Sequence, residues 1–567
     1  MRLAVDIWLP VERTAAGGTV GTIMRVTRYH RAAVPRAPGP EADTNAAAGA
    51  LFNGAGFALV VVDARGTGAS FGTRTGELGE REIADYGELI DWIAAQPWSN
   101  GRVGVYGTSH EGQAAELIAG LGTAHLVAVA ALFSPYDPYR ELFYPGGCCT
   151  GGRYARWMYQ CQLEDGVHSA LERLAAITGQ PAETIALPQP VKPVDGPDGP
   201  ALLEAAIAEH QSNTDVNALL GRVPFRDDRV AGLDWEATAP AAGGPAIAAS
   251  GVPMLIRAGW LDGGFAAGAL TRFVTQANQQ QVEIGPWGHG GGSFADTLRP
   301  SGAAQDEWLS PGSQDRRLVA FFANHLEARG QPAGPRTLTF ATLGTGTWET
   351  VTAWPPAGSG TQRWYLDSLA GLTRAAGPAE TVTHRVDVTA STGATNRWLA
   401  IDLDRAPAYP DRKQADASLL TFTSEPLPAA VHVLGFPVVT LRLATSGTDG
   451  AVYVYLEDVD PDGDLRYLSE GCLRFLHRRT PSPAEPTRLG VPRSFARADA
   501  LPVVPGKPMS LTVHLLPISA AVQAGHRIRV AIAGHDASSF TRYGPAEETF
   551  SLRVGSDAHL DLPTRDG

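Results

Sequence analysis

The sequence has few cysteines and no long uninterrupted apolar run. None of its apolar stretches approaches the roughly 20 residues that a transmembrane helix needs. The N-terminal segment MRLAVDIWLP lacks the basic start and long apolar stretch of a signal peptide and reads as a strand. The cysteines have neither metal-site spacing nor the pattern of a disulfide framework; they are Cys148, Cys149, Cys161 and Cys472. These absences predict reduced thiols, no membrane partner and a cytoplasmic location.

Basic residues are also in the minority. The chain has 46 Lys and Arg against 59 Asp and Glu, which gives a net charge of −13. Nucleic acids and anionic membranes both favour basic patches, so this charge argues against either as a partner. With 567 residues, the chain exceeds what one hydrophobic core usually supports, and two or three domains are expected.

The N-terminal part alternates apolar strands with helices. Buried strands are expected at Thr22–Thr27, Phe57–Val62, Leu126–Leu132 and Val252–Asp262. Apolar residues recur at helical spacing over about 81–96. Strand–helix–strand alternation of this kind indicates an α/β domain with a mostly parallel sheet. Residues 1–134 and 246–330 are assigned to it.

The pattern changes twice further along the chain. Residues 135–245 contain helical stretches separated by a loop rich in Pro and Gly, which indicates an inserted helical cap. Residues 336–567 are dominated by short β-rich runs between turns, beginning with TLTFATL. Such spacing is typical of an antiparallel sandwich or jelly roll.

The segment GVYGTSHEG (Gly104–Gly112) joins a predicted strand to a predicted helix. A sharp strand-to-helix turn strains the backbone of Ser109, needs small neighbours and lifts the serine hydroxyl above the sheet edge. The usual nucleophile pattern is G-x-S-x-G, but here the second glycine comes one place late and Glu111 takes its slot. An ordinary strand–helix turn is the alternative interpretation.

A nucleophilic serine needs a base, and the base needs an orienting carboxylate. In α/β-hydrolases these partners follow the serine in the order acid, then histidine, each after a strand. Asp262 follows VPMLIRAGW and His289 follows VEIGPW, so both fit. Taken singly, Asp262 is equally typical of a turn, and His289 of a buried hydrogen-bonded histidine. His110 is a rival base whose ring is expected to point away from the serine, and Glu111 is expected to hydrogen bond behind the turn.

These stretches together resemble the cocaine esterase-like family, which includes the X-Pro dipeptidyl peptidases. The matching segments are GFALVVVDARGTGASFG, DYGELIDWIAAQPWSNGRVGVYGTSHEG, RAGWLDGG and IGPWGHGG, and LTFTSEPL and AGHRIRVAIAG resemble its jelly roll. The elbow of that family reads G-x-S-x-x-G, as Gly107–Gly112 does. The resemblance implies an α/β-hydrolase core, a helical cap and a C-terminal jelly roll, with Ser109 as nucleophile, Asp262 as acid and His289 as base. The short turn that usually precedes LAVDIWLP is missing, which suggests a misassigned start codon.

The resemblance also implies an oxyanion hole formed by the backbone N–H of His110 and the hydroxyl of Tyr29. The usual proline before this tyrosine is Arg28 here, and a surface aromatic is the alternative interpretation of Tyr29. Arg65 is expected to pin its loop by pairing with a carboxylate. Members that hydrolyse α-amino acid esters carry carboxylates just after the catalytic acid. Gly263–Phe265 stand there in this chain, so that type of ammonium recognition is not expected.

An aromatic substrate pocket is expected around the serine. Its candidate residues are Trp260, Phe265, Trp287, Phe143 and Trp157, although any single one of them is more typical of a core. An apolar pocket suits a neutral ester with a bulky acyl or aryl group. The predicted function is therefore a serine hydrolase that cleaves an ester or amide bond of a small-molecule substrate through an acyl-enzyme, without metal or organic cofactor.

Two alternatives stay open at this point. One is X-Pro dipeptidyl-peptidase or acylase activity on amides. The other is a non-catalytic glycan-binding protein, since jelly rolls often bind glycans, although the intact Ser–Asp–His order argues against it. The sequence also leaves open whether the chain forms a homo-oligomer.

Overall fold

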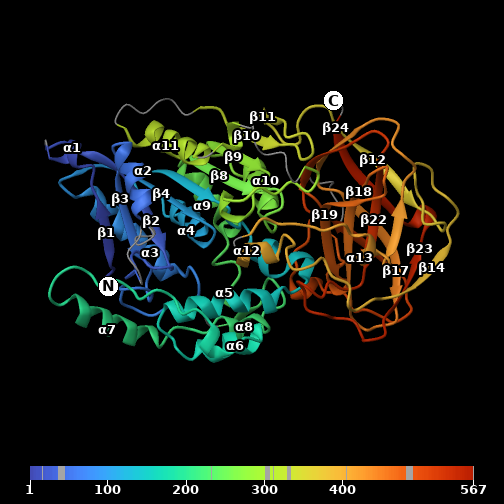
Figure 1. Cartoon of the computed structure of the whole chain (residues 1–567), viewed down its shortest axis with the longest axis horizontal. Helices are drawn as coiled ribbons and strands as arrows, with labels where there is room; N and C mark the ends of the chain where they lie inside the picture. The colour runs from blue at the N-terminus through green and yellow to red at the C-terminus, as the bar shows by residue number, and fades with distance from the viewer. Residues whose placement is uncertain are drawn as a thin grey trace.

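The computed structural model describes residues 1–15, 17–35, 45–230, 233–299, 307–310, 312–327, 334–403, 405–480 and 489–565. Figure 1 shows an α/β domain in blue to green, a group of teal helices along one side of it, and a β-rich domain in orange to red. In these ranges, no helix combines the length and the apolar character that a membrane crossing requires.

The α/β domain is built on one large sheet, in which the described residues form nine strands. In sheet order these are β1 (Val5–Trp8), β3 (Ala58–Asp63), β2 (Val20–Thr27), β4 (Ser99–Thr108), β5 (Leu126–Leu132), β8 (Met254–Gly259), β9 (Gln280–Gly285), β10 (Thr337–Ala341) and β11 (Trp348–Val351). The edge strands β1 and β11 run antiparallel to their neighbours, and the strands between them are parallel. The predicted mostly parallel sheet is confirmed.

Helices cover both faces of this sheet. One face carries α2 (Ala46–Gly54) and α11 (Ser313–Leu326); the other carries α3 (Glu80–Ala94), α4 (His110–Ala119), α9 (Pro240–Ser250) and α10 (Phe265–Thr275). Along β3, Leu59 and Val61 pack with the first group, whereas Val60 and Val62 pack with the second. A strand buried on both sides has no polar face, which explains the continuous apolar run in the sequence.

Strands β10 and β11 correct the expected domain boundary at residue 336. β10 includes most of the run TLTFATL and pairs in parallel with β9, so that Leu338 lies opposite Val282 and Phe340 opposite Ile284. These side chains are buried in the core of the α/β domain. The run is therefore part of the hydrolase sheet, because its apolar residues complete the face next to β9.

The inserted segment is helical, as predicted. Its helices are α5 (Gly151–Glu164), α6 (Ala170–Thr178), α7 (Gly199–His210) and α8 (Asn217–Leu220), and they lie together beside the core in Figure 1. The expected end of this cap at residue 245 is too late. Helix α9 begins at Pro240, and its residue Ile247 is buried in the cluster that also contains α4.

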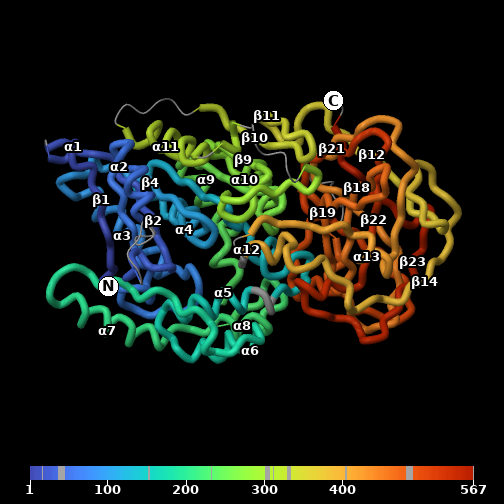
Figure 2. The backbone as a smooth tube through the Cα atoms, in the orientation of Figure 1, coloured from blue at the N-terminus to red at the C-terminus, as the bar shows by residue number. Residues whose placement is uncertain are grey.

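The C-terminal domain contains antiparallel sheets. In the described residues, one sheet is built around β12 (Ser359–Leu366), β24 (His559–Arg565), β17 (Val438–Thr445), β23 (Thr549–Arg553) and β14 (Thr381–Arg385), and another consists of β15 (Leu420–Thr423), β22 (Arg527–Ala533), β18 (Ala451–Val459) and β19 (Leu465–Arg474). Leu441 and Leu443 from the first share a core with Val454 and Ile532 from the second. The antiparallel character is confirmed, and the jelly-roll connectivity stays a prediction. Figure 2 shows the segment with α12 (Leu399–Leu403) at the border between the two domains.

A buried ion pair joins helices α4 and α10. Arg272 Nη2 lies 2.8 Å from Glu116 Oε2, and the side chains of Arg272 and Glu116 are 1% and 0% exposed. The Arg272 guanidinium also donates to the carbonyl oxygen of Ser134, at 3.2 Å. Helix α4 carries the residues that follow Ser109, so this pair fixes the helix behind the nucleophile.

We expect Arg272→Ala to reduce the free energy of unfolding by about 3–5 kcal/mol, because it leaves the Glu116 carboxylate buried without its charge partner. Chemical denaturation measures the loss. The matched control is Arg363→Ala, which breaks an ion pair with Asp561 whose arginine is 49% exposed; its cost should stay within about 1 kcal/mol. Equal losses in the two variants would contradict this account.

Candidate active site

Ser109 lies at a strained turn between β4 and α4. Its backbone has φ 62° and ψ −124°, a conformation that residues with a side chain rarely adopt. The strain is held from both sides: Ser109 N–H donates to Leu132 O at 2.8 Å, and Ser109 O accepts from Gln113 N–H at 2.9 Å. The predicted strand-to-helix elbow is therefore present.

The glycines of the motif permit the close contact between strand and helix. A Cβ on Gly107 would lie 2.4 Å from the carbonyl carbon of Glu111. A Cβ on Gly112 would lie 2.8 Å from Gly107 O and 2.9 Å from the Ser134 Cβ. The late second glycine is thus the residue that packs on the end of the strand. Position 111 therefore does not have to be a glycine.

Glu111 instead points to the back of the turn. Its carboxylate accepts from Arg25 Nε at 2.8 Å and from Arg25 Nη2 at 3.0 Å, a two-point ion pair with strand β2. Glu111 is 2% exposed. The expectation of a structural residue behind the elbow is confirmed. Arg65 likewise pins its loop, through Asp85 at 2.7 Å.

Asp262 and His289 meet at the carboxyl ends of β8 and β9. His289 Nδ1 lies 3.0 Å from Asp262 Oδ1 and 3.1 Å from Asp262 Oδ2. The carboxylate is fully buried, and the imidazole is 14% exposed. A histidine that donates its Nδ1 proton to a carboxylate carries its lone pair on Nε2, the form that a general base requires. The interpretation of Asp262 as a mere turn former does not account for this pair.

The loop that carries Asp262 is clamped by Arg397 from the C-terminal domain. The Arg397 side chain is fully buried and donates to Trp260 O at 2.6 Å and to Gly263 O at 2.9 Å, on either side of the acid. It also donates to the Tyr467 hydroxyl at 3.2 Å. No sequence motif predicts the role of Arg397, because that role depends on how two distant parts of the chain pack together.

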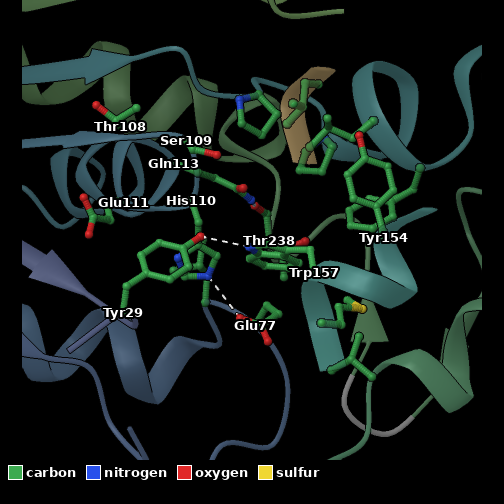
Figure 3. Close-up of a pocket in the computed structure, with 18 of the residues that line it drawn as sticks. Tyr29, Glu77, Thr108, Ser109, His110, Glu111, Gln113, Tyr154, Trp157 and Thr238 are labelled. Atoms are coloured by element: carbon green, nitrogen blue, oxygen red, sulfur yellow. Dashed lines mark hydrogen bonds and ion pairs between the residues drawn. The ribbon is translucent and has the colours of Figure 1, made fainter. Parts of the chain in front are cut away.

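The predicted oxyanion donors line the same cavity as Ser109. His110 is the first residue of α4, where backbone N–H groups have no acceptor within the helix. The Tyr29 hydroxyl accepts a hydrogen bond from Trp157 Nε1 at 3.2 Å (Figure 3). Burial raises the pKa of Tyr29 well above its usual value, so the hydroxyl keeps its proton at neutral pH. Tyr29 lines a cavity instead of lying on the outer surface.

The side chain of His110 is occupied elsewhere. Its Nε2 lies 3.0 Å from Glu77 Oε2, and Figure 3 shows the ring turned toward that carboxylate. Burial alone raises the pKa of Glu77, but the guanidinium groups of Arg28 and Arg74 outweigh it and hold the pKa well below its usual range. Glu77 is therefore an anion that fixes the imidazole of His110. The expectation that this ring is no base for Ser109 agrees with the contact.

A cavity of about 730 Å³ opens beside Ser109, His289 and Tyr29. Three of the five predicted aromatic residues line it, namely Phe143, Trp157 and Phe265. The prediction for Trp260 and Trp287 is wrong. Trp260 is buried and donates to Ala341 O at 2.7 Å, and Trp287 packs against Phe133 and Trp348. Both follow strands of the sheet, and their side chains fill the core beneath the site.

Several residues that sequence reasoning missed also line the cavity. They are Tyr154, Trp235 and Leu220 from the cap, Ile401 from helix α12 of the C-terminal domain, and the carboxylates Glu77 and Glu164. Burial raises the pKa of Glu164 to about 7. Their only sequence signal is apolar or acidic character within the cap and loops, which is common to many positions.

The strained serine turn, the Asp–His pair and the adjacent apolar cavity on this sheet define the protein as a serine hydrolase of the α/β-hydrolase type. The chain belongs to the X-Pro dipeptidyl-peptidase (S15) family. That family model matches residues 1–291, and the model of the X-Pro dipeptidyl-peptidase C-terminal non-catalytic domain matches residues 332–556.

Three comparisons illustrate the family relationship. A protein of Mycobacterium bovis named as an inferred serine esterase is 36% identical over 607 residues, covering 99% of this chain and 93% of its own. The cocaine esterase of a Rhodococcus species is 26% identical over 517 residues, covering 86% of this chain and 81% of its own. The structure of a CocE/NonD family hydrolase from Staphylococcus aureus shares the fold with a TM-score of 0.70 at 16% identity, covering 100% of this chain and 91% of that one.

We expect Gly107→Ala to lower kcat/KM by about 10²-fold or more, because displacing the first turn of α4 misplaces Ser109. Steady-state kinetics with a nitrophenyl ester measure the loss. Gly79→Ala is the matched control, since Gly79 has a φ of −68° and open space around an added Cβ. Near wild-type turnover in Gly107→Ala would show that the elbow does not depend on this contact.

We expect Arg397→Met, which keeps an unbranched apolar stem but removes the donors, to lower kcat by about 10²-fold through displacement of Asp262. Rates are normalised to the fraction of enzyme that a covalent serine probe titrates. Arg442→Met, on the exposed face of β17, serves as the control. If Arg397→Met lowers only the unfolding temperature and spares kcat, then the clamp does not position the acid.

Proposed function

We propose that the protein hydrolyses carboxylic esters through an acyl-enzyme on Ser109. The observation that carries this proposal is that the Asp262–His289 pair opens on the same largely apolar cavity as Ser109. A general base, its orienting acid and a strained serine around one pocket are the parts that acyl transfer needs.

In the proposed mechanism, His289 Nε2 takes the proton of Ser109 as its Oγ attacks the ester carbonyl carbon. The tetrahedral oxyanion is held by the backbone N–H of His110 and the hydroxyl of Tyr29. His289 then gives its proton to the leaving alkoxide, and the acyl group stays on Ser109. Water, deprotonated by His289, releases the acid by the same steps in reverse order. Asp262 stabilises the imidazolium that forms each time.

The walls of the cavity support a neutral ester with a bulky acyl or aryl group. Aromatic side chains from the cap, among them Phe143, Trp157 and Trp235, offer apolar surface. The mycobacterial relative is named for serine esterase activity, and the Rhodococcus relative for cocaine ester cleavage. Gly263 and Gly264 follow Asp262, so the carboxylates expected of α-amino acid ester hydrolases do not stand there.

The second candidate is amide hydrolysis, either as an X-Pro dipeptidyl peptidase or as an acylase. The description of the family model favours the peptidase. The same serine, base and donors would act on an amide, with His289 protonating the leaving amine. The two candidates differ in leaving group and not in machinery, so substrate comparison separates them.

The proposal also includes a cytoplasmic location and small-molecule substrates as the partners. The free thiols of the four cysteines support a reducing compartment. The net charge of −13 supports the absence of nucleic-acid or anionic-membrane partners.

We expect Ser109→Ala to lower kcat on a nitrophenyl acyl ester by about 10⁶-fold, because the nucleophile is removed. Circular dichroism checks that the fold is intact. A panel of neutral aryl esters, aryl amides and Xaa-Pro anilides, measured as kcat/KM on the wild type, should rank esters first. Undiminished turnover in the variant would refute the role of Ser109, and preference for Xaa-Pro anilides would favour the peptidase. Failure of the wild type to react with a fluorophosphonate would revive a non-catalytic function.

A further inference from the structure

The hydrogen bond between Trp157 and Tyr29 has a fixed direction. An indole N–H is a donor only, whereas a phenol offers one O–H donor and two acceptor lone pairs. The 3.2 Å contact between Trp157 Nε1 and the Tyr29 oxygen therefore leaves the phenolic proton for another acceptor. A carboxylate in the same place would take up that proton and turn it away from the substrate.

The aromatic ring of Tyr29 is also held in place. The His110 ring packs edge-on against it with centroids 6.5 Å apart, and lies 6.1 Å from the ring of Trp157. His110 is fixed in turn by its 3.0 Å contact with Glu77. Figure 3 shows these four side chains gathered on one side of the cavity, below Ser109. The hydroxyl of Tyr29 thus has little freedom to turn.

Arg28 connects this group to the cap. Its guanidinium bonds Glu77 Oε1 at 2.5 Å and Asp165 Oδ2 at 3.1 Å, and its central carbon lies 5.4 Å from the centroid of the Trp157 ring. Asp165 is the C-cap of α5, the helix that carries Trp157. Arg28 directly precedes Tyr29, so one buried residue joins the tyrosine, the Glu77 loop and the cap helix.

We propose that Trp157 is a positioning residue of the oxyanion hole, which acts through the hydroxyl of Tyr29 and is held over it by Arg28. The inference rests on the proposed function, since it assigns Tyr29 to the oxyanion. The hydrogen bond that Trp157 donates orients the phenol of Tyr29. It also strengthens the hydrogen bond from the Tyr29 hydroxyl to the developing negative charge, because chained hydrogen bonds polarise one another. If Trp157 only lined the pocket, its substitution would instead affect substrate binding.

The test is a double-mutant cycle of Trp157→Phe and Tyr29→Phe with a nitrophenyl ester, read as kcat, KM and the single-turnover rate of acylation. Tyr29→Phe should lower acylation by about 10²–10³-fold, as expected for loss of one oxyanion donor. Trp157→Phe should lower acylation by about three- to tenfold with little change in KM, since it removes one hydrogen bond and keeps an aromatic ring. In the Tyr29→Phe background, the same substitution should change acylation by less than about twofold.

The matched control is Trp235→Phe in the same cycle. Trp235 also lines the cavity, and its Nε1 donates at an equal 3.2 Å, but to Val223 O instead of Tyr29. Trp235→Phe should change the acylation rate by the same factor in the wild-type and Tyr29→Phe backgrounds, whatever the size of that factor.

Each outcome has one interpretation. If Trp157→Phe costs its full factor in the Tyr29→Phe background, or acts on KM alone, the positioning role is refuted. If Tyr29→Phe itself acylates at the wild-type rate, the oxyanion assignment within the proposed function fails. A wild type without ester turnover refutes the proposed function itself.

Discussion

The backbone of Ser109 is held in a conformation that a free peptide avoids, and the active site is arranged around this constraint. Such a conformation costs about 1–3 kcal/mol, which the surroundings must offset. Here the offset comes from hydrogen bonds to β5 and α4, from the contact that Gly107 and Gly112 permit, and from the Arg25–Glu111 pair behind the turn. All of these lie in the sheet or at helix α4. The nucleophile is therefore held by the core of the domain itself.

Other groups at the site come from the cap and the C-terminal domain, which lie outside the sheet that carries Ser109. Arg397 and Ile401 come from the C-terminal domain, and the first holds the Asp262 loop while the second lines the cavity. Trp157 comes from the cap and contacts Tyr29 of the core. The C-terminal domain thus contributes to the site without supplying any of the three predicted catalytic side chains. Its family description as non-catalytic agrees with this division.

Local patterns in the sequence predicted what local physics determines. The run FALVVV indicated a strand buried on both faces, and small residues around Ser109 between a strand and a helix indicated the strained turn, because both depend on neighbours within a few residues. The pairing of TLTFATL with β9 was missed, since a short β-rich run does not specify which sheet edge it joins. Trp260 and Trp287 were placed in the pocket for being near Asp262 and His289 in the chain. Each tryptophan stands two positions before its catalytic partner, yet in the structure both are buried in the core and do not line the cavity.

Polar contacts and apolar contacts have different roles around the cavity. The proposed catalytic groups are oriented by polar contacts: Asp262 on His289, Trp157 on Tyr29 and Arg397 on the Asp262 loop. The walls of the cavity are largely apolar and mostly come from the cap. Hydrogen bonds and buried ion pairs depend steeply on geometry, whereas apolar contact tolerates changes of shape at modest cost. Substitutions in walls other than Trp157 are therefore expected to alter the substrate accepted without displacing the proposed oxyanion donors. Arg28 links the two parts of the site, because its ion pairs to Glu77 and Asp165 tie the end of the cap helix α5 to the Glu77 loop.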